Sequence, residues 1–166
     1  MIKNQNLLRP LASLTIFKLN NHSNQEVDWL RFNVRSNSRW CLRWIQHSGD
    51  AQEFADLVNV QYGKVFCISF STAGGIGEEQ DLEIYNGLIR ISDFLREQHN
   101  GRNWQPSLQP LPLLARITEE QIEEEGANEE IEAQMINVGL VLGYFAVKIQ
   151  AKMAKAETLN RFIHNN

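Results

Sequence analysis

An arginine recurs at every fourth position in the stretch VDWLRFNVRSNSRWCLRWIQHS, residues 27–48. The four residues are Arg31, Arg35, Arg39 and Arg43. On a helix this spacing places all four side chains in one stripe, and on a strand it points all of them to one side of a sheet. The choice between helix and strand here decides the fold class of the N-terminal half.

The same stretch alternates between apolar and other residues, which is typical of half-buried strands. The apolar even positions are Leu30, Phe32, Val34, Trp40, Leu42 and Trp44. Ser36, Asn37 and Ser38 interrupt the alternation with residues that favour turns. On a helix, Leu30, Phe32 and Val34 would scatter around the axis. We therefore predict a β-hairpin centred on Asn37, with a helix as the alternative.

Residues 1–71 are predicted to form mainly sheet. Two further apolar runs, 12–19 and 64–71, have the composition of strands, and the second has the apolar character of a central strand. Residues 51–58 indicate one or two helical turns. The expected result is an antiparallel sheet of about four strands.

The remainder of the chain is predicted to supply two principal helices packed on that sheet. Apolar residues at helical spacing indicate a helix over 81–99. Three prolines make 104–117 an extended crossing segment. Residues 118–163 have an acidic start, with Thr118 as a helix N-cap, and then a long helix from about Glu129 with a heptad pattern. The predicted fold is α+β, in one domain spanning 1–166.

The charge of the chain is unevenly distributed. Its net charge is −4, which argues against bulk binding to DNA or RNA. The first 50 residues, however, carry seven basic and three acidic residues, whereas residues 51–100 carry three basic and eight acidic residues. A basic first third is thus joined to an acidic remainder.

Three explanations fit the arginines. They could point into water, with their stems over apolar neighbours. They could be neutralised within the chain by the glutamates of 119–132, or by Glu78, Glu79 and Asp81. They could also contact an acidic protein surface or a phosphate backbone. Because like charges opposite one another destabilise a hairpin, we favour a partner-binding surface. Its predicted residues are Trp29, Arg31, Arg35, Arg39 and Arg43, with a second acidic set of Glu123, Glu124, Glu125 and Glu129.

Other motifs give weak signals. The loop STAGGIGEEQ lacks the third glycine and the lysine of phosphate-binding loops. The glutamate run lacks the spacing of a calcium loop, so we expect neither a metal nor a cofactor. Cys41 and Cys67 are expected to be unpaired, which suits a reducing compartment. We expect no signal peptide and no membrane span, and therefore a cytoplasmic protein.

The sequence favours a non-enzymatic protein-binding protein, such as an inhibitor, an immunity-type protein or an accessory subunit. It also favours a monomer over a homo-oligomer. One alternative is a ribonucleoprotein subunit whose arginines contact RNA or single-stranded nucleic acid. A weaker alternative is a thiol-dependent enzyme using Cys67 or Cys41. The hairpin also predicts that Trp40 and Trp44 are buried, with Phe66, Ile68 and Phe70 as sheet neighbours.

Overall fold

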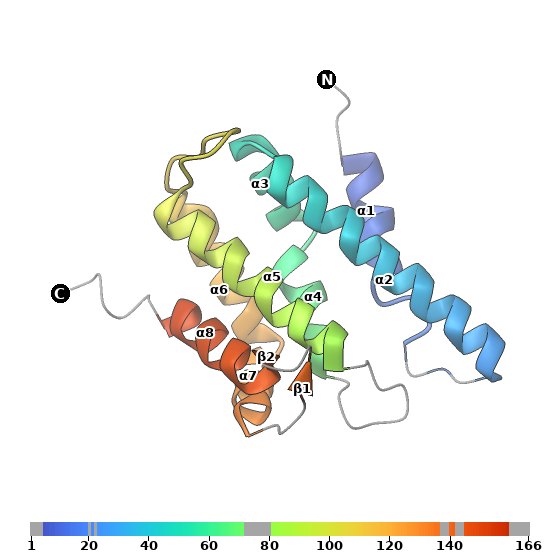
Figure 1. The fold of residues 1–166 in the computed structure, drawn as a ribbon. Helices are drawn as coiled ribbons and strands as arrows, with labels where there is room; N and C mark the ends of the chain where they lie inside the picture. The colour runs from blue at the N-terminus through green and yellow to red at the C-terminus, as the bar shows by residue number, and fades with distance from the viewer. Residues whose placement is uncertain are drawn as a thin grey trace.

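The computed structural model describes residues 5–19, 21, 23–71, 81–136, 140–141 and 145–159. These residues form eight α-helices and one antiparallel pair of two-residue strands (Figure 1). The elements are α1 Gln5–Leu14, α2 Gln25–Ser48, α3 Ala51–Asn59, α4 Tyr62–Ser71, α5 Asp81–Asn100, α6 Pro112–Glu124, α7 Ala127–Met135, β1 Leu140–Val141, β2 Phe145–Ala146 and α8 Val147–Leu159. The predicted α+β fold with a four-strand sheet is therefore wrong, and the fold is all-helical.

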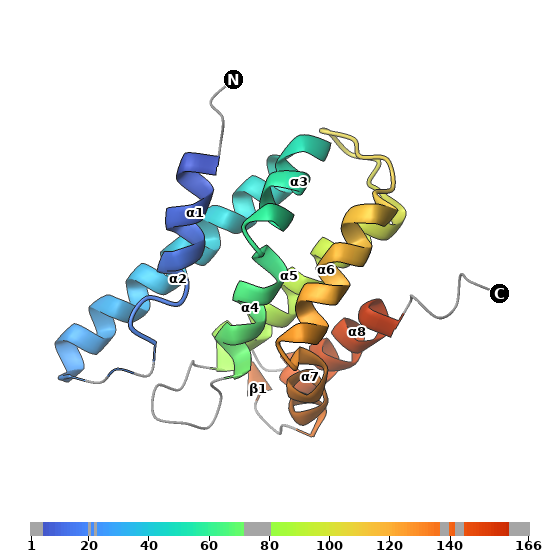
Figure 2. The same cartoon turned by 180° about the vertical axis from the view of Figure 1, so that it is seen from behind.

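Helix α5 lies at the centre of the arrangement and contacts α4, α6 and α8, while α7 packs against α8. Helix α1 crosses α2, which runs along one side of the molecule. In both views the N-terminal end of α2 extends beyond the other helices (Figures 1 and 2). Aromatic rings hold α3, α4 and α5 together: Phe94 stacks on Phe54 at 5.2 Å between ring centroids and meets Tyr62 at 4.6 Å.

The predicted hairpin over 27–46 is one continuous helix, α2. Its start is fixed by Asn24, whose side chain accepts a hydrogen bond from the backbone N–H of Val27 at 2.9 Å. Glu26 and Asp28 add favourable charge to the first turn. The expected turn at residues 36–38 does not break the helix, because the Ser38 hydroxyl donates to the Val34 carbonyl one turn earlier at 2.7 Å.

The two other predicted strands are also helical or turn segments. Residues 12–14 end α1 and 15–19 are turns, whereas 64–71 lies within α4. A short apolar run cannot be distinguished from a buried helix by periodicity alone. Helix α4 packs against α5, α6 and α7, so apolar residues are needed around much of its circumference. The helical turns predicted over 51–58 and the helix predicted over 81–99 are present as α3 and α5.

The C-terminal third differs from its prediction in three ways. The extended segment ends at Leu111, because Pro112 starts α6 in the first helical turn, where its missing N–H costs nothing. Thr118 is a buried residue inside α6 and not an N-cap. The predicted long helix is broken into α7 and α8. Gly126, with φ of +68°, separates α6 from α7 in a conformation that favours glycine.

The Asp50→Ala variant should lose about 1 kcal/mol of its free energy of unfolding. Asp50 caps α3 by accepting from the backbone N–H of Gln52 at 2.7 Å and of Glu53 at 3.3 Å, and the Glu53 carboxylate accepts from the Asp50 N–H at 3.0 Å. Urea unfolding followed by circular dichroism measures the loss. Asp50→Asn keeps an accepting oxygen and should lose much less, and equal losses in the two variants would contradict the capping role.

Candidate protein-binding surface

The four predicted arginines lie on the face of α2 that points into the molecule. Arg35 and Arg39 are buried, with 7% and 1% of their surface exposed, and Arg31 and Arg43 are partly buried. On a helix, the four-residue spacing gathers the four arginines into one stripe. On a strand, the same spacing would have placed them on one side of the sheet. None of the four side chains is fully exposed.

The central arginines pair with acidic residues of α5. Arg39 Nη1 donates to Glu83 Oε2 at 3.2 Å, and its Nη2 donates to the Thr15 carbonyl at 2.9 Å. Arg43 Nη2 donates to Asp93 Oδ2 at 2.6 Å. These charge-assisted bonds connect α2 to α5 and to the end of α1.

The N-terminal arginines hold the connection between α1 and α2. Arg31 Nη1 donates to the Asn21 carbonyl at 2.6 Å and to Asp28 Oδ1 at 3.2 Å. Arg35 Nη1 donates to the Phe17 carbonyl at 3.3 Å. The arginines are thus neutralised partly within the chain, through Glu83, Asp93 and Asp28. Glu78 and Glu79, considered as partners from the sequence, lie outside the described residues.

The opposite face of α2 is apolar and points outward. Trp29 is 63% exposed, Trp44 62% and Trp40 47%, and Leu30 and Val34 also lie exposed beside them. The prediction that Trp40 and Trp44 are buried is wrong, and the side chain of Phe70 lies outside those described. Helix α2 therefore buries its arginine side together with Leu42, and exposes most of its other apolar residues. We name the residues Trp29, Leu30, Val34, Trp40, Cys41 and Trp44 the α2 apolar face.

Of the residues on this face, only Trp29 was predicted from the sequence to bind a partner. On a helical wheel, the six residues of the α2 apolar face span about 140°, at 100° per residue, and the arginines occupy the other side. That pattern was available in the sequence. The period-two alternation and the turn-forming residues 36–38 favoured a hairpin instead, because Leu30, Phe32 and Val34 do not all share one face of a helix.

Arg90 of α5 supports the α2 apolar face from beneath. Its side chain is buried, and its guanidinium carbon lies 5.1 Å from the Trp40 ring centroid and 5.3 Å from that of Phe66. Removal from water lowers the pKa of Arg90. The cation–π contact fixes one face of Trp40 against the protein, so that the other parts of the ring are presented outward.

The acidic residues predicted as a second surface lie around the junction of α6 and α7. Glu123, Glu124 and Glu129 are exposed, whereas Glu125 is half-buried and pairs with Lys64 of α4. In both views this junction lies across the molecule from α2 (Figures 1 and 2). The structure therefore does not bring the two predicted surfaces together.

The cysteines are both unpaired. Cys67 is buried in α4, and burial raises the pKa of its thiol, which opposes formation of the thiolate nucleophile. Cys41 is exposed on the α2 apolar face. Over the described part of the chain, no group of three histidine, cysteine, aspartate or glutamate side chains is placed to hold a metal ion. Within the same residues no helix has the length and apolar character needed to cross a bilayer.

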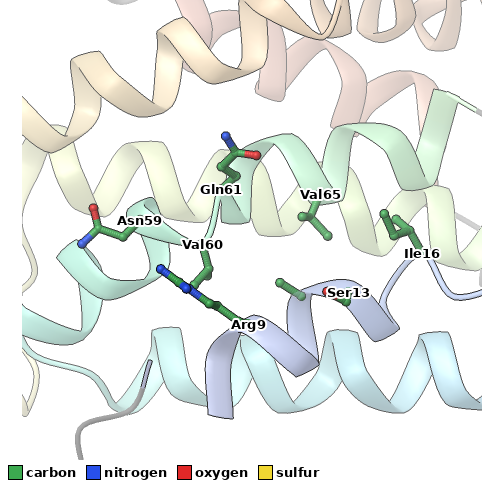
Figure 3. Close-up of a pocket in the computed structure, with 8 residues that line it drawn as sticks. Arg9, Ser13, Ile16, Asn59, Val60, Gln61 and Val65 are labelled. Carbon is green, nitrogen blue, oxygen red and sulfur yellow. The ribbon is translucent and has the colours of Figure 1, made fainter. Parts of the chain in front are cut away.

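One groove lies between α1 and the junction of α3 and α4 (Figure 3). It has a volume of about 320 Å³ and is open to solvent. Both polar and apolar side chains line the groove, and Arg9 is the charged residue among them. The other lining residues are Ala12, Ser13, Ile16, Asn59, Val60, Gln61 and Val65. These residues do not combine a nucleophile with a base, so the groove does not suggest a reaction.

Comparison with known proteins gives no relative. No family, curated protein or solved structure matches this chain.

Proposed function

We propose that this chain is a non-enzymatic protein-binding protein whose partner docks on the α2 apolar face. The observation that carries the proposal is the exposure of Trp29, Trp40 and Trp44 on one side of one helix. Tryptophan is enriched among the residues that dominate binding energy at protein interfaces. Contiguous apolar patches on a folded surface commonly mark interaction sites.

The buried arginines support this role from inside. Their ion pairs with α5 and hydrogen bonds to the α1–α2 connection hold α2 in one orientation. A rigid, preorganised helix loses less conformational entropy on binding than a mobile one. In this proposal the arginines position the binding surface, and the tryptophans make the contact.

Nucleic-acid binding receives less support from the geometry. A phosphate backbone requires exposed positive charge along its path, and the arginine row that motivated this alternative faces inward. Exposed tryptophans could stack on bases. Glu26 lies exposed at the N-terminal end of the same helix, however, where it would repel phosphate.

We further propose an intracellular location. Both cysteines are unpaired, and Cys41 is exposed. An exposed free thiol is best preserved in a reducing compartment. This part of the proposal is independent of the partner.

The double variant Trp29→Ser and Trp44→Ser should lose its protein partner while keeping its fold. Each tryptophan truncated at an interface centre weakens binding substantially, so the combined affinity should fall on the order of 100-fold or more. Affinity capture from the native host with quantitative mass spectrometry measures the loss. Leu113→Ser on α6 is the matched control, because Leu113 is 78% exposed and lies outside the α2 apolar face. If the double variant and the control retained the same partners, the proposal would be wrong.

A further inference from the structure

We propose that the partner on the α2 apolar face is a second copy of this chain, packed as an antiparallel α2–α2 pair about a two-fold axis at Asn37. This inference rests on the proposed function and specifies its partner. An interface of this symmetry uses the same patch on both copies, so each contact occurs twice. The patch must therefore be complementary to itself when its direction is reversed.

The sequence of α2 has this property. Positions equally distant from Asn37 pair Leu30 with Trp44 and Val34 with Trp40, and they pair Trp29 with the partly buried Ile45; Cys41 falls opposite Asn33. In an antiparallel pair crossing at Asn37, each small or aliphatic side chain would meet a tryptophan of the partner helix. Alternation of large and small side chains across a helix pair permits close packing.

The exposed Asn37 would lie at the two-fold axis and face its own copy. An amide side chain carries both a donor and an acceptor, so two copies can hydrogen-bond to each other. A single polar residue in an otherwise apolar helix seam fixes the register of pairing. Asn37 would thus select the alignment that brings Leu30 and Trp44 together.

The ends of the helix are also complementary. Reversal about Asn37 places the exposed Glu26 of one copy opposite the exposed Ser48 of the other, a carboxylate next to a hydroxyl that can donate a hydrogen bond. The two helix dipoles run in opposite directions, so the negative end of each lies near the positive end of the other. Both features favour the antiparallel pair over a parallel one.

The area available is sufficient for a specific interface. Given their exposed fractions, the three tryptophans offer roughly 400 Å² per copy, with Leu30 and Val34 adding about 150 Å². Two copies would bury about 1,100 Å² of apolar surface, near the lower limit for specific association. The α2 helix of 24 residues, about 36 Å long, accommodates this contact along its length. We therefore expect a concentration-dependent dimer.

Sedimentation equilibrium tests the dimer and its register. The full chain should approach twice its 19.1 kDa mass as concentration rises. Trp44→Glu should raise the dissociation constant by roughly 1,000-fold, because the change occurs twice per interface. Adding Leu30→Lys to Trp44→Glu should recover at least about tenfold of that loss, since the two introduced charges face each other only between copies. Circular dichroism checks that each variant keeps its helical content.

Disulfide cross-linking gives a second readout. In a Cys41→Ser background, Asn37→Cys should form a covalent dimer under mild oxidation, because its two copies meet at the axis. Glu124→Cys, at an exposed position of α6, should remain monomeric under the same conditions.

Dimerisation weakened by Trp44→Glu, together with cross-linking at position 37, supports the inference. A chain that stays monomeric at high micromolar concentration and does not cross-link at position 37 overturns it. So does a dimer that Trp44→Glu leaves intact, because it must use another face. Either contrary result leaves the proposed function standing if the double tryptophan variant still loses a partner of different sequence.

Discussion

The Arg39→Ala variant should lose roughly 3–5 kcal/mol of its free energy of unfolding. Arg39 is 1% exposed and pairs with Glu83, which is also buried. Removing the guanidinium leaves the Glu83 carboxylate without its charge partner in a region of low dielectric, and it leaves the Thr15 carbonyl without a donor. Denaturant unfolding measured by circular dichroism gives the change directly.

A double variant separates the contribution of the Arg39–Glu83 ion pair to stability from the contribution of side-chain packing. Arg39→Met with Glu83→Gln removes both charges and keeps most of the side-chain volume, so it should recover a large part of the lost stability. Arg31→Met changes the partly exposed member of the same stripe and should cost much less. If Arg39→Ala unfolded at the same denaturant concentration as the parent, the arginine stripe would not be internal.

The Arg102→Ala variant should be destabilised by a similar amount, roughly 3–5 kcal/mol. The Arg102 guanidinium is buried and joins the end of α2 to the end of α5. It donates to the carbonyls of Gln46, His47 and Gly49, and pairs with Glu97 at 3.3 Å. Its loss removes this donor from the His47 and Gly49 carbonyls, whereas the Gln46 carbonyl keeps the backbone N–H of Gly49.

The stability of Arg102→Ala should also depend on pH in a specific direction. Burial raises the pKa of Glu97 in the parent, and Arg102 opposes that shift. Without Arg102, the pKa of Glu97 in the folded state should rise further above its unfolded value. The folded state then binds a proton that the unfolded state lacks, so stability should increase as the pH is lowered from 7 to 5.

Adding Glu97→Gln to Arg102→Ala should abolish this pH dependence, because position 97 no longer titrates. A parallel fall in stability of Arg102→Ala and its parent on acidification would contradict the assignment. Two-state unfolding at each pH, fitted with a common slope, provides the comparison.

Helices α3 and α5 could be predicted because their sequences follow the usual relation between pattern and burial. In α5, the spaced residues Ile84, Leu88, Ile91 and Leu95 are all buried. Helix α2 follows the opposite relation. Its arginines are buried or partly buried and its tryptophans are exposed, whereas the alternation of apolar residues predicted a hairpin with Trp40 and Trp44 on its core side.

The partners that make this reversal possible are distant in the sequence. Glu83 lies 44 residues from Arg39, and Asp93 lies 50 residues from Arg43. Nothing in a local pattern indicates that these carboxylates will meet the arginines. The free-energy cost of burying the arginines is offset only by tertiary contacts. Because the local sequence does not reveal these contacts, the exposure of Trp40 and Trp44 could not be predicted from it.

The placement of the tryptophans determines what the fluorescence of this protein reports. Trp104, the fourth, is 48% exposed, so every tryptophan in the chain already contacts water in the folded state. Unfolding should therefore change the emission wavelength little, whereas covering the α2 apolar face should shift it toward the blue. In most proteins the intrinsic fluorescence comes from buried tryptophans and reports whether the core is folded. Here it would serve as a label-free sensor of occupancy, with three of its four emitters on the surface that is to be occupied.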